Sequence, residues 1–155
     1  PMCCTSIGLW SGNEPILGVV YDFNRGETFS GIANINASID GKDIEVSETS
    51  NIQDAILCTG FPVNTDFSNR SLSDFVKHIS DYKKVRLMGS AALSLAYVAC
   101  GRVDSYIEED IMLWDVAAGL ALILGAGGRI NLSSGRHKWS YKVYASNYNI
   151  TKNDV

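Results

Sequence analysis

A group of acidic residues in the second half of the sequence holds the first candidates for chemistry. Glu108 ends a predicted strand, and Asp115 follows seven residues later, directly after Trp114 and at the start of an apolar segment. Carboxylates and phosphate oxygens are the ligands that Mg²⁺ prefers, and α/β proteins usually hold ligands at the carboxyl ends of strands. We therefore expect Glu108 and Asp115 to face one crevice, with Glu109 and Asp110 solvated in the connecting loop.

A second candidate is the sequence Gly89-Ser90-Ala91, which lies between a predicted strand and a predicted helix. A helix start points free backbone N–H groups and a positive dipole end outward, and small residues there allow a phosphate or a hydroxyl to approach closely. Each candidate also has a purely structural interpretation. Ser90 is an ordinary helix N-cap residue, Asp115 would stabilise a helix start by itself, and Glu108 alone resembles a surface acid.

The elements that must position these residues change character near residue 55. The first part reads as an antiparallel meander over residues 5–10, 16–21 and 27–32, with a turn at Asp40-Gly41 and a short strand through Ile44 and Val46. After it, apolar strands alternate with amphipathic or apolar helices. The expected strands are 55–61, 84–88, 103–108, 129–132 and 141–147, and the expected helices are 72–79, 90–100 and 116–126. This order predicts an α+β fold, with residues 1–54 in an antiparallel subdomain and residues 55–155 in an α/β subdomain.

Composition narrows the class of protein. The chain has 155 residues, of which 46% are hydrophobic and 19% charged, with a net charge of −4. This balance is typical of a globular domain, and it argues against nucleic acid or an anionic membrane surface as the partner, since both require clustered Lys and Arg. No apolar stretch reaches the roughly 18 to 20 residues of a membrane span, so we expect a cytoplasmic protein. The four cysteines lack CxxC spacing and are predicted to be reduced core thiols.

Longer motifs resemble a known family. The sequence "WDVAAGLALILGAGGRI" from Trp114 is similar to WDxAAGxxLxxxAGG, the second signature of the inositol monophosphatase family, and "GSAALSLAYVACGRVDSYIEE" precedes it at the family's spacing. Upstream, "TSIGLWSGNEPILGVVYD" resembles the paired strands after the family's first signature, and "TGFP" resembles the opening of its second subdomain. The resemblance extends from about residue 1 to residue 147.

The resemblance implies the C-terminal portion of a layered α/β/α/β/α fold and Mg²⁺-dependent hydrolysis of a small phosphate monoester of the inositol monophosphate type. By position, Asp115 would bind the metal and touch the substrate. Gly89, Ser90 and Ala91 would line the hydroxyls of a phosphorylated polyol or sugar, and Glu108 would accept a hydrogen bond from one of them. Trp114 would wedge the helix start in place, while the helix dipole would keep Asp115 ionised.

The sequence also departs from the family. Neither the DPxDGT signature nor the upstream glutamate, which supply the family's other metal ligands, occurs in these 155 residues. One carboxylate does not hold Mg²⁺, so we expect an inactive, truncated fragment with weak or absent metal binding. The alternatives are a non-catalytic binding or regulatory module on this scaffold, or a relative specific for fructose bisphosphate, histidinol phosphate or a 3′-phosphonucleotide.

The expected truncation would also affect assembly of the chain. Absent covering helices would leave open strand edges and an apolar sheet face around Ile7, Leu9, Leu17 and Val19. Exposed faces and edges of this kind promote association. We therefore expect a homodimer or a larger assembly.

Overall fold

The computed structural model describes residues 2–61, 65 and 67–150, and within them the strands form two five-stranded sheets. The first sheet is antiparallel and follows the chain in the order β1-β2-β3-β4-β5. Its strands are β1 (Cys4–Ser11), β2 (Glu14–Asp22), β3 (Glu27–Ile32), β4 (Asn36–Ile39) and β5 (Lys42–Asp43). The predicted meander is therefore confirmed.

The second sheet is mixed and has the order β7-β6-β8-β10-β9. β6 pairs in parallel with β7 and β8, while β10 pairs antiparallel with β8 and β9. Its strands are β6 (Ile56–Thr59), β7 (Lys84–Leu87), β8 (Ser105–Met112), β9 (Arg129–Ser134) and β10 (Ser140–Ser146). The described helices are α1 (Asn69–Ile79), α2 (Ala91–Ala99) and α3 (Leu113–Gly125), with a short 3₁₀ turn, η1 (Ile52–Asp54).

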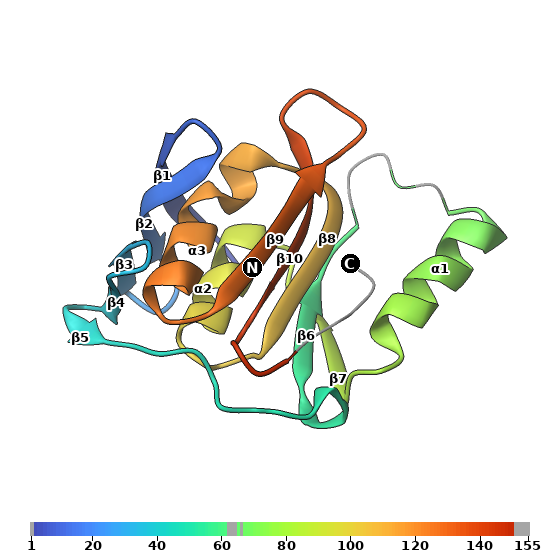
Figure 1. Cartoon of the computed structure of the whole chain (residues 1–155), viewed down its shortest axis with the longest axis horizontal. Helices are drawn as coiled ribbons and strands as arrows, with labels where there is room; N and C mark the ends of the chain where they lie inside the picture. Colours follow the sequence, from blue (N-terminus) through green and yellow to red (C-terminus); the bar gives the residue numbers. More distant parts are fainter. Residues whose placement is uncertain (1, 62–64, 66, 151–155) are drawn as a thin grey trace.

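Helices α2 and α3 lie between the two sheets, and α1 lies beyond the second sheet (Figure 1). The main core cluster joins side chains of the first sheet, such as Phe29, to side chains of both helices and to Val143 of β10. Residues Val116 to Ile123 of α3 are all buried. A helix that is apolar on every side is one that is covered on every side, which explains why α3 carries no charge after its first turn.

Glycines allow α3 to pack closely on the first sheet. Gly8 and Gly18 face each other across β1 and β2. A β-carbon on either glycine would overlap the backbone of Ala117 or Ala118 in α3. The small residues on both surfaces therefore set how near the helix approaches the sheet, and through α3 they set the position of Asp115 in its first turn.

One predicted strand is wrong. The chain turns at Asp40 and Gly41, which have φ angles of 50° and 79° as a two-residue hairpin turn requires, but the strand after it is β5 at Lys42–Asp43 and not a run through Ile44 and Val46. The backbone N–H of Ile44 donates to Ala37, and that of Val46 donates to Ala126 beyond α3. Val46 thus leaves the sheet to close the end of a helix, a contact that local pattern does not reveal.

The α+β fold class is confirmed, and the change from one sheet to the other occurs between β5 and β6. The main core cluster draws on both sheets, so the helix layer is shared by the two parts of the chain. The division into residues 1–54 and 55–155 stays a prediction.

The four cysteines are free, but only Cys58 is fully buried, and Cys3 is exposed. The prediction of core thiols is therefore wrong for Cys3, which directly precedes the edge strand β1. Burial raises the pKa of the Cys58 thiol to about 11. In the described part of the chain, no helix combines the length and the apolar character that a membrane crossing requires.

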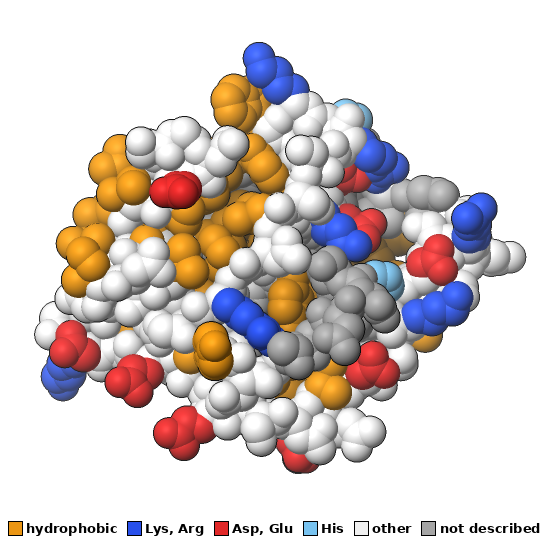
Figure 2. Space-filling view, viewed as in Figure 1, with side chains coloured by type: hydrophobic (Ala, Val, Ile, Leu, Met, Phe, Trp, Pro, Cys, Tyr) orange, Lys and Arg blue, Asp and Glu red, His pale blue; other side chains and the backbone are white. Residues whose placement is uncertain are grey.

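The first sheet has one face that α2 and α3 do not cover, as predicted. Ile7 and Leu9 of β1 are 60% and 57% exposed, and they pair directly with Val19 and Leu17 of β2, which are half-buried. Ile32 of β3 continues this row at 40% exposure. Figure 2 shows hydrophobic side chains gathered over the end of the molecule that holds β1 and β2.

Candidate functional site

A cavity of about 440 Å³ lies where β1, β6 and β8 meet the starts of α2 and α3. All five residues that the sequence predicted for the site line it, although they come from three separate segments. They are Gly89, Ser90, Ala91, Glu108 and Asp115. The prediction that Glu108 and Asp115 face one crevice is thereby confirmed.

The turn from β7 into α2 forms one wall of this cavity. Gly89 has a φ of 73°, which favours glycine, and Ser90 caps the helix, with its hydroxyl accepting a hydrogen bond from the N–H of Leu93 at 3.3 Å. The structural interpretation of Ser90 is therefore correct, and it coexists with the position of Ser90 in the cavity. The same hydroxyl lies 3.8 Å from the thiol of Cys4 on β1.

Glu108 is not the surface acid that its sequence alone suggested. It is only 8% exposed, and its Oε2 accepts a hydrogen bond of 2.6 Å from the hydroxyl of Tyr106. Burial raises the pKa of Glu108; the bond from Tyr106 works against this rise, and the charge of Asp115 adds to it. Among the described residues, no donor contacts Oε1, so this buried carboxylate is only half satisfied.

Asp115 occupies the first turn of α3 with its side chain exposed at the cavity. The helix begins after Met112 without any side-chain capping bond, so Asp115 does not serve as a cap. Partial burial raises the pKa of Asp115. Lost hydration disfavours the ionised form of Asp115, and a bound cation would favour it.

Three expectations about these acids and their neighbours are wrong. Trp114 is 61% exposed and lines the cavity, so it does not wedge the helix start in a buried position. Asp110 is not solvated, since its side chain is 8% exposed and it accepts hydrogen bonds from Arg136 and from Ser140. Burial opposes the effect of these bonds, but together they lower the pKa of Asp110. Glu109 is 61% exposed, as expected, and pairs with Lys142 at 3.4 Å. The expected end of the strand at Glu108 is wrong, because β8 continues to Met112 and Glu109 and Asp110 lie within it, not in a connecting loop.

Several residues of the cavity were missed by sequence reasoning. Ser6 of β1 contributes a buried hydroxyl oxygen that has no hydrogen-bond partner among the described residues. Tyr106 contributes the hydroxyl that holds Glu108. Tyr106 could have been predicted, because residues two apart on one strand point to the same face as each other, and Glu108 was already a candidate. Ser6 could not, because it comes from the other sheet and no local pattern indicates that contact.

The donor set of the cavity does not fit a complete magnesium site. Within the described residues, no group of three or more His, Cys, Asp or Glu side chains is placed to hold a metal ion. Mg²⁺ demands near-octahedral oxygen coordination, and Asp115 and Glu108 are the only carboxylates among the described residues that line the cavity. Asp115 can supply one ligand, and the others have to come from additional oxygens.

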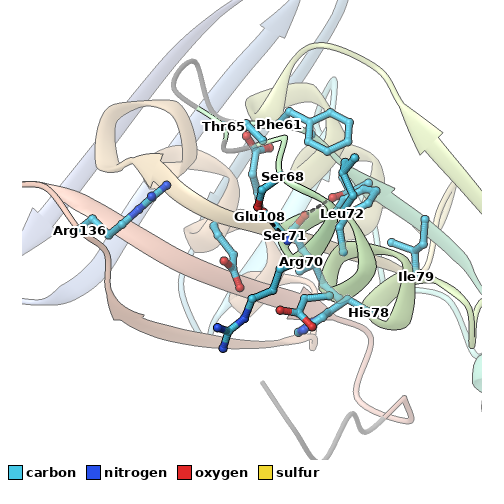
Figure 3. A pocket seen from close by; sticks show the side chains of 16 residues that line it. Phe61, Thr65, Ser68, Arg70, Ser71, Leu72, His78, Ile79, Glu108 and Arg136 are labelled. Atoms are coloured by element: carbon cyan, nitrogen blue, oxygen red, sulfur yellow. Dashed lines mark hydrogen bonds between the residues drawn. The ribbon is translucent and has the colours of Figure 1, made fainter.

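A second cavity of about 510 Å³ adjoins the first and shares Thr59, Gly60 and Glu108 with it. Figure 3 shows Glu108 and Arg136 on one side of this space and the side chains of α1, including Leu72 and His78, on the other. Glu108 therefore stands between the two cavities. The sequence assigned no role to His78, and none of the residues from α1 was predicted for a site.

Comparison with known proteins agrees with this geometry. A sequence model described as the Inositol monophosphatase family matches residues 1–153. The chain belongs to the inositol monophosphatase family. It is 38% identical to an inositol-1-monophosphatase of Synechocystis, over 84% of the chain and 46% of that protein, and 37% identical to the Nus factor SuhB of Xylella fastidiosa, over 84% of the chain and 48% of that protein.

Solved structures of inositol monophosphatases show the same fold. The structure of the enzyme from Anabaena superposes with a TM-score of 0.82 at 38% identity, covering 94% of this chain and 59% of that one. SuhB of Mycobacterium tuberculosis gives a TM-score of 0.83 at 28% identity, with coverage of 94% and 59%. This chain spans about half the length of the curated relatives it matches.

Proposed function

We propose that these residues form the part of a phosphatase site that binds the polyol and one face of the cation, in an inositol monophosphatase that hydrolyses a small phosphate monoester. The observation that carries the proposal is the convergence of two helix starts and Glu108 on one cavity. Membership of the family and the names of the relatives support a phosphatase. Magnesium, when bound, would neutralise phosphate charge and activate a water molecule.

The residues of the chain suit a phosphorylated polyol. The start of α2 at Gly89-Ser90-Ala91 offers backbone N–H groups to a hydroxyl or a phosphate oxygen. Glu108 has one carboxylate oxygen with no donor among the described residues, which suits a hydrogen bond from a substrate hydroxyl. Asp115 projects from a helix start into the same space, where it can supply one oxygen to a cation.

Charge supports the need for a cation. The described residues that line the 440 Å³ cavity include two carboxylates and no Lys or Arg. A phosphate dianion beside Glu108 and Asp115 would be repelled unless a cation lay between them. Because the cavity supplies too few oxygens to fix that cation, we propose that these 155 residues by themselves do not turn over substrate, and we assign no catalytic step to them.

Binding of inositol 1-phosphate tests the proposal without requiring turnover. Titrated into the ¹⁵N-labelled chain with Mg²⁺ present, inositol 1-phosphate is expected to shift the amide resonances of Gly89, Ser90, Glu108 and Asp115. The Asp115→Asn variant should weaken the effect of Mg²⁺, and Asp54→Asn, a change at an exposed acid on η1, is the matched control. Shifts confined to other parts of the chain would contradict the proposal.

A non-catalytic binding module remains the second candidate, and the low number of carboxylates favours it. The same titration separates the two, because a module that does not depend on a cation would bind equally well in the presence of EDTA. The substrate class is tested by comparing the affinity for inositol 1-phosphate with the affinities for fructose 1,6-bisphosphate, histidinol phosphate and a 3′-phosphonucleotide. The free cysteines support the proposed cytoplasmic location, since thiols stay reduced there.

We also propose that the open face of the first sheet mediates association of the chain with a second copy. The row of Ile7, Leu9 and Ile32 is exposed and apolar, and apolar patches of this kind are typical of interaction surfaces. Light scattering is expected to show a dimer or larger species that Leu9→Lys shifts towards the monomer. Ile35→Lys, at an isoleucine that is 73% exposed beyond β3, is the control; a wild-type monomer at all concentrations would overturn the proposal.

A further inference from the structure

We propose that Tyr106 is a positioning residue that, together with Gly60, fixes the carboxylate of Glu108 so that its Oε1 alone is presented to a ligand hydroxyl. This inference rests on the proposed function, since it names how Glu108 selects its ligand. None of the sequence motifs singles out Tyr106 or Gly60 for this role. The contacts around Glu108 carry the inference.

The hydroxyl of Tyr106 defines one end of the arrangement. Tyr106 and Glu108 are two residues apart on β8, so their side chains leave the strand on the same face. Tyr106 is 1% exposed, and its hydroxyl lies 2.6 Å from Oε2 of Glu108. Burial and the neighbouring carboxylate raise the pKa of Tyr106 well above its ordinary value. The phenol therefore keeps its proton and donates the hydrogen bond, which Glu108 accepts.

Gly60 lies beside the same carboxylate and leaves the room that it occupies. It follows β6, whose Thr59 pairs with Ile107 of β8, and this pairing brings the Gly60 backbone against Glu108. A β-carbon on Gly60 would lie 2.5 Å from Oε2 and 3.1 Å from Oε1. The separation from Oε2 is shorter than real β-carbons show, so a side chain at this position would displace the carboxylate, which is the end of a flexible side chain.

The consequence is that the two oxygens of Glu108 have different surroundings. Oε2 is occupied by Tyr106, and Oε1 has no donor among the described residues. Oε1 is not one of the buried side-chain atoms that lack a partner among the described residues, so it is open to the cavity and can accept a hydrogen bond from a ligand hydroxyl. A ligand that displaces water from Oε1 but lacks the hydroxyl leaves this acceptor unsatisfied, which is costly. The arrangement therefore discriminates between polyol phosphates by the presence of one hydroxyl.

The test compares inositol 1-phosphate with its monodeoxy analogues, by calorimetric titration in the presence of Mg²⁺. The chain is expected to bind one analogue about 10-fold more weakly or worse, as a lost hydrogen bond to a charged group predicts. Tyr106→Phe should reduce this discrimination to less than about 3-fold. Tyr141→Phe removes the hydroxyl of a half-buried tyrosine on the adjacent strand β10 and should leave the discrimination unchanged.

A second pair of variants separates positioning from folding. Glu108→Gln should abolish the discrimination, and adding Tyr106→Phe to it should then have no further effect on binding. Gly60→Ala should act like Tyr106→Phe, because the added β-carbon displaces the same carboxylate. Full discrimination in a folded Tyr106→Phe variant would overturn the inference while leaving the proposed function intact. Equal binding of all analogues by the unmodified chain, or no binding of any, would overturn both.

Discussion

Two buried carboxylates lie four residues apart, one directly before β8 and one within it, and their oxygens are satisfied to different degrees. Asp104, directly before the strand, accepts hydrogen bonds from the hydroxyl of Ser47 at 2.5 Å and from the N–H of Ile56 at 2.6 Å, one on each oxygen. Glu108, four residues later, accepts one from Tyr106 on Oε2. Their exposures are nearly equal, at 6% and 8%.

The difference supports our proposal that Asp104 serves the fold and Glu108 serves a ligand. Asp104 ties the segment before η1 to the start of β6, and Asn147 extends this network by donating to Ser47 at 2.8 Å. A carboxylate with donors on both oxygens needs nothing further. Glu108 keeps one oxygen available at a cavity, which a structural role does not require. Burial alone therefore does not distinguish the two roles, whereas the number of donors does.

The largest expected effect is the loss of stability on removing the structural acid. Asp104→Ala leaves the N–H of Ile56 and the hydroxyl of Ser47 without their acceptor, and we expect a loss of about 3 kcal/mol in the free energy of unfolding. Urea denaturation measures it. The exposed Asp54, paired with Lys83 at the surface, is the control, and Asp54→Ala should cost less than about 1 kcal/mol. Equal costs for the two variants would break the comparison.

The next effect concerns ligand binding at Glu108, within the strand. Glu108→Gln should weaken binding of inositol 1-phosphate by about 10-fold or more, since a hydrogen bond to a charged acceptor is lost. Its free energy of unfolding should change by less than about 1 kcal/mol, because the amide oxygen still accepts from Tyr106. Calorimetry and urea denaturation on the same samples give both quantities. If Glu108→Gln is strongly destabilised but binds inositol 1-phosphate normally, then Glu108 serves the fold and not a ligand, contrary to the comparison with Asp104.

A smaller effect is expected in the pH dependence of stability. Burial raises the pKa of Glu108 above its ordinary value of 4.5, so the folded chain holds this proton to higher pH than the unfolded chain does. The contribution of Glu108 to stability is therefore lost as the pH rises from 4.5 through the folded pKa. Glu108→Gln should remove this decline from the profile of unfolding free energy against pH. Parallel profiles for the two proteins would argue against the raised pKa.

The smallest effect is predicted for Asp115. Its side chain is exposed and makes no capping bond to α3, so Asp115→Asn should change the free energy of unfolding by less than about 0.5 kcal/mol. Its effect should appear only when Mg²⁺ and a phosphate ester are present. Thermal unfolding without and with these ligands checks this. If Asp115→Asn lowers the free energy of unfolding in the absence of ligands, then Asp115 has a structural role like that of Asp104.

Sequence reasoning went furthest where local pattern and motif agreed. The meander, the helix starts at Ser90 and before Asp115, and the convergence with Glu108 follow from strand-turn-helix order and from the family's motif. It failed where the partner lies far away in the chain. Asp110 meets Arg136, which is 26 residues on, and Val46 meets the end of α3.

The wrong expectation for Trp114 has a related cause. An aromatic residue beside an apolar helix suggests burial, yet only the packing of α3 decides which residues of its first turn face the sheets. Val116 is buried and Trp114 is 61% exposed. The sequence also could not predict that only one oxygen of Glu108 has a hydrogen-bond donor, because this depends on which groups the fold brings close to the other oxygen.

Phosphate release from inositol 1-phosphate by the purified 155-residue chain, at millimolar Mg²⁺, tests the central claim most directly. The account holds that Asp115 and Glu108 bind the ester and one face of a cation but do not complete a metal site. It predicts that ligand binding is measurable while phosphate release stays at the level of the Asp115→Asn variant. Turnover by the unmodified chain that Asp115→Asn abolishes would contradict it.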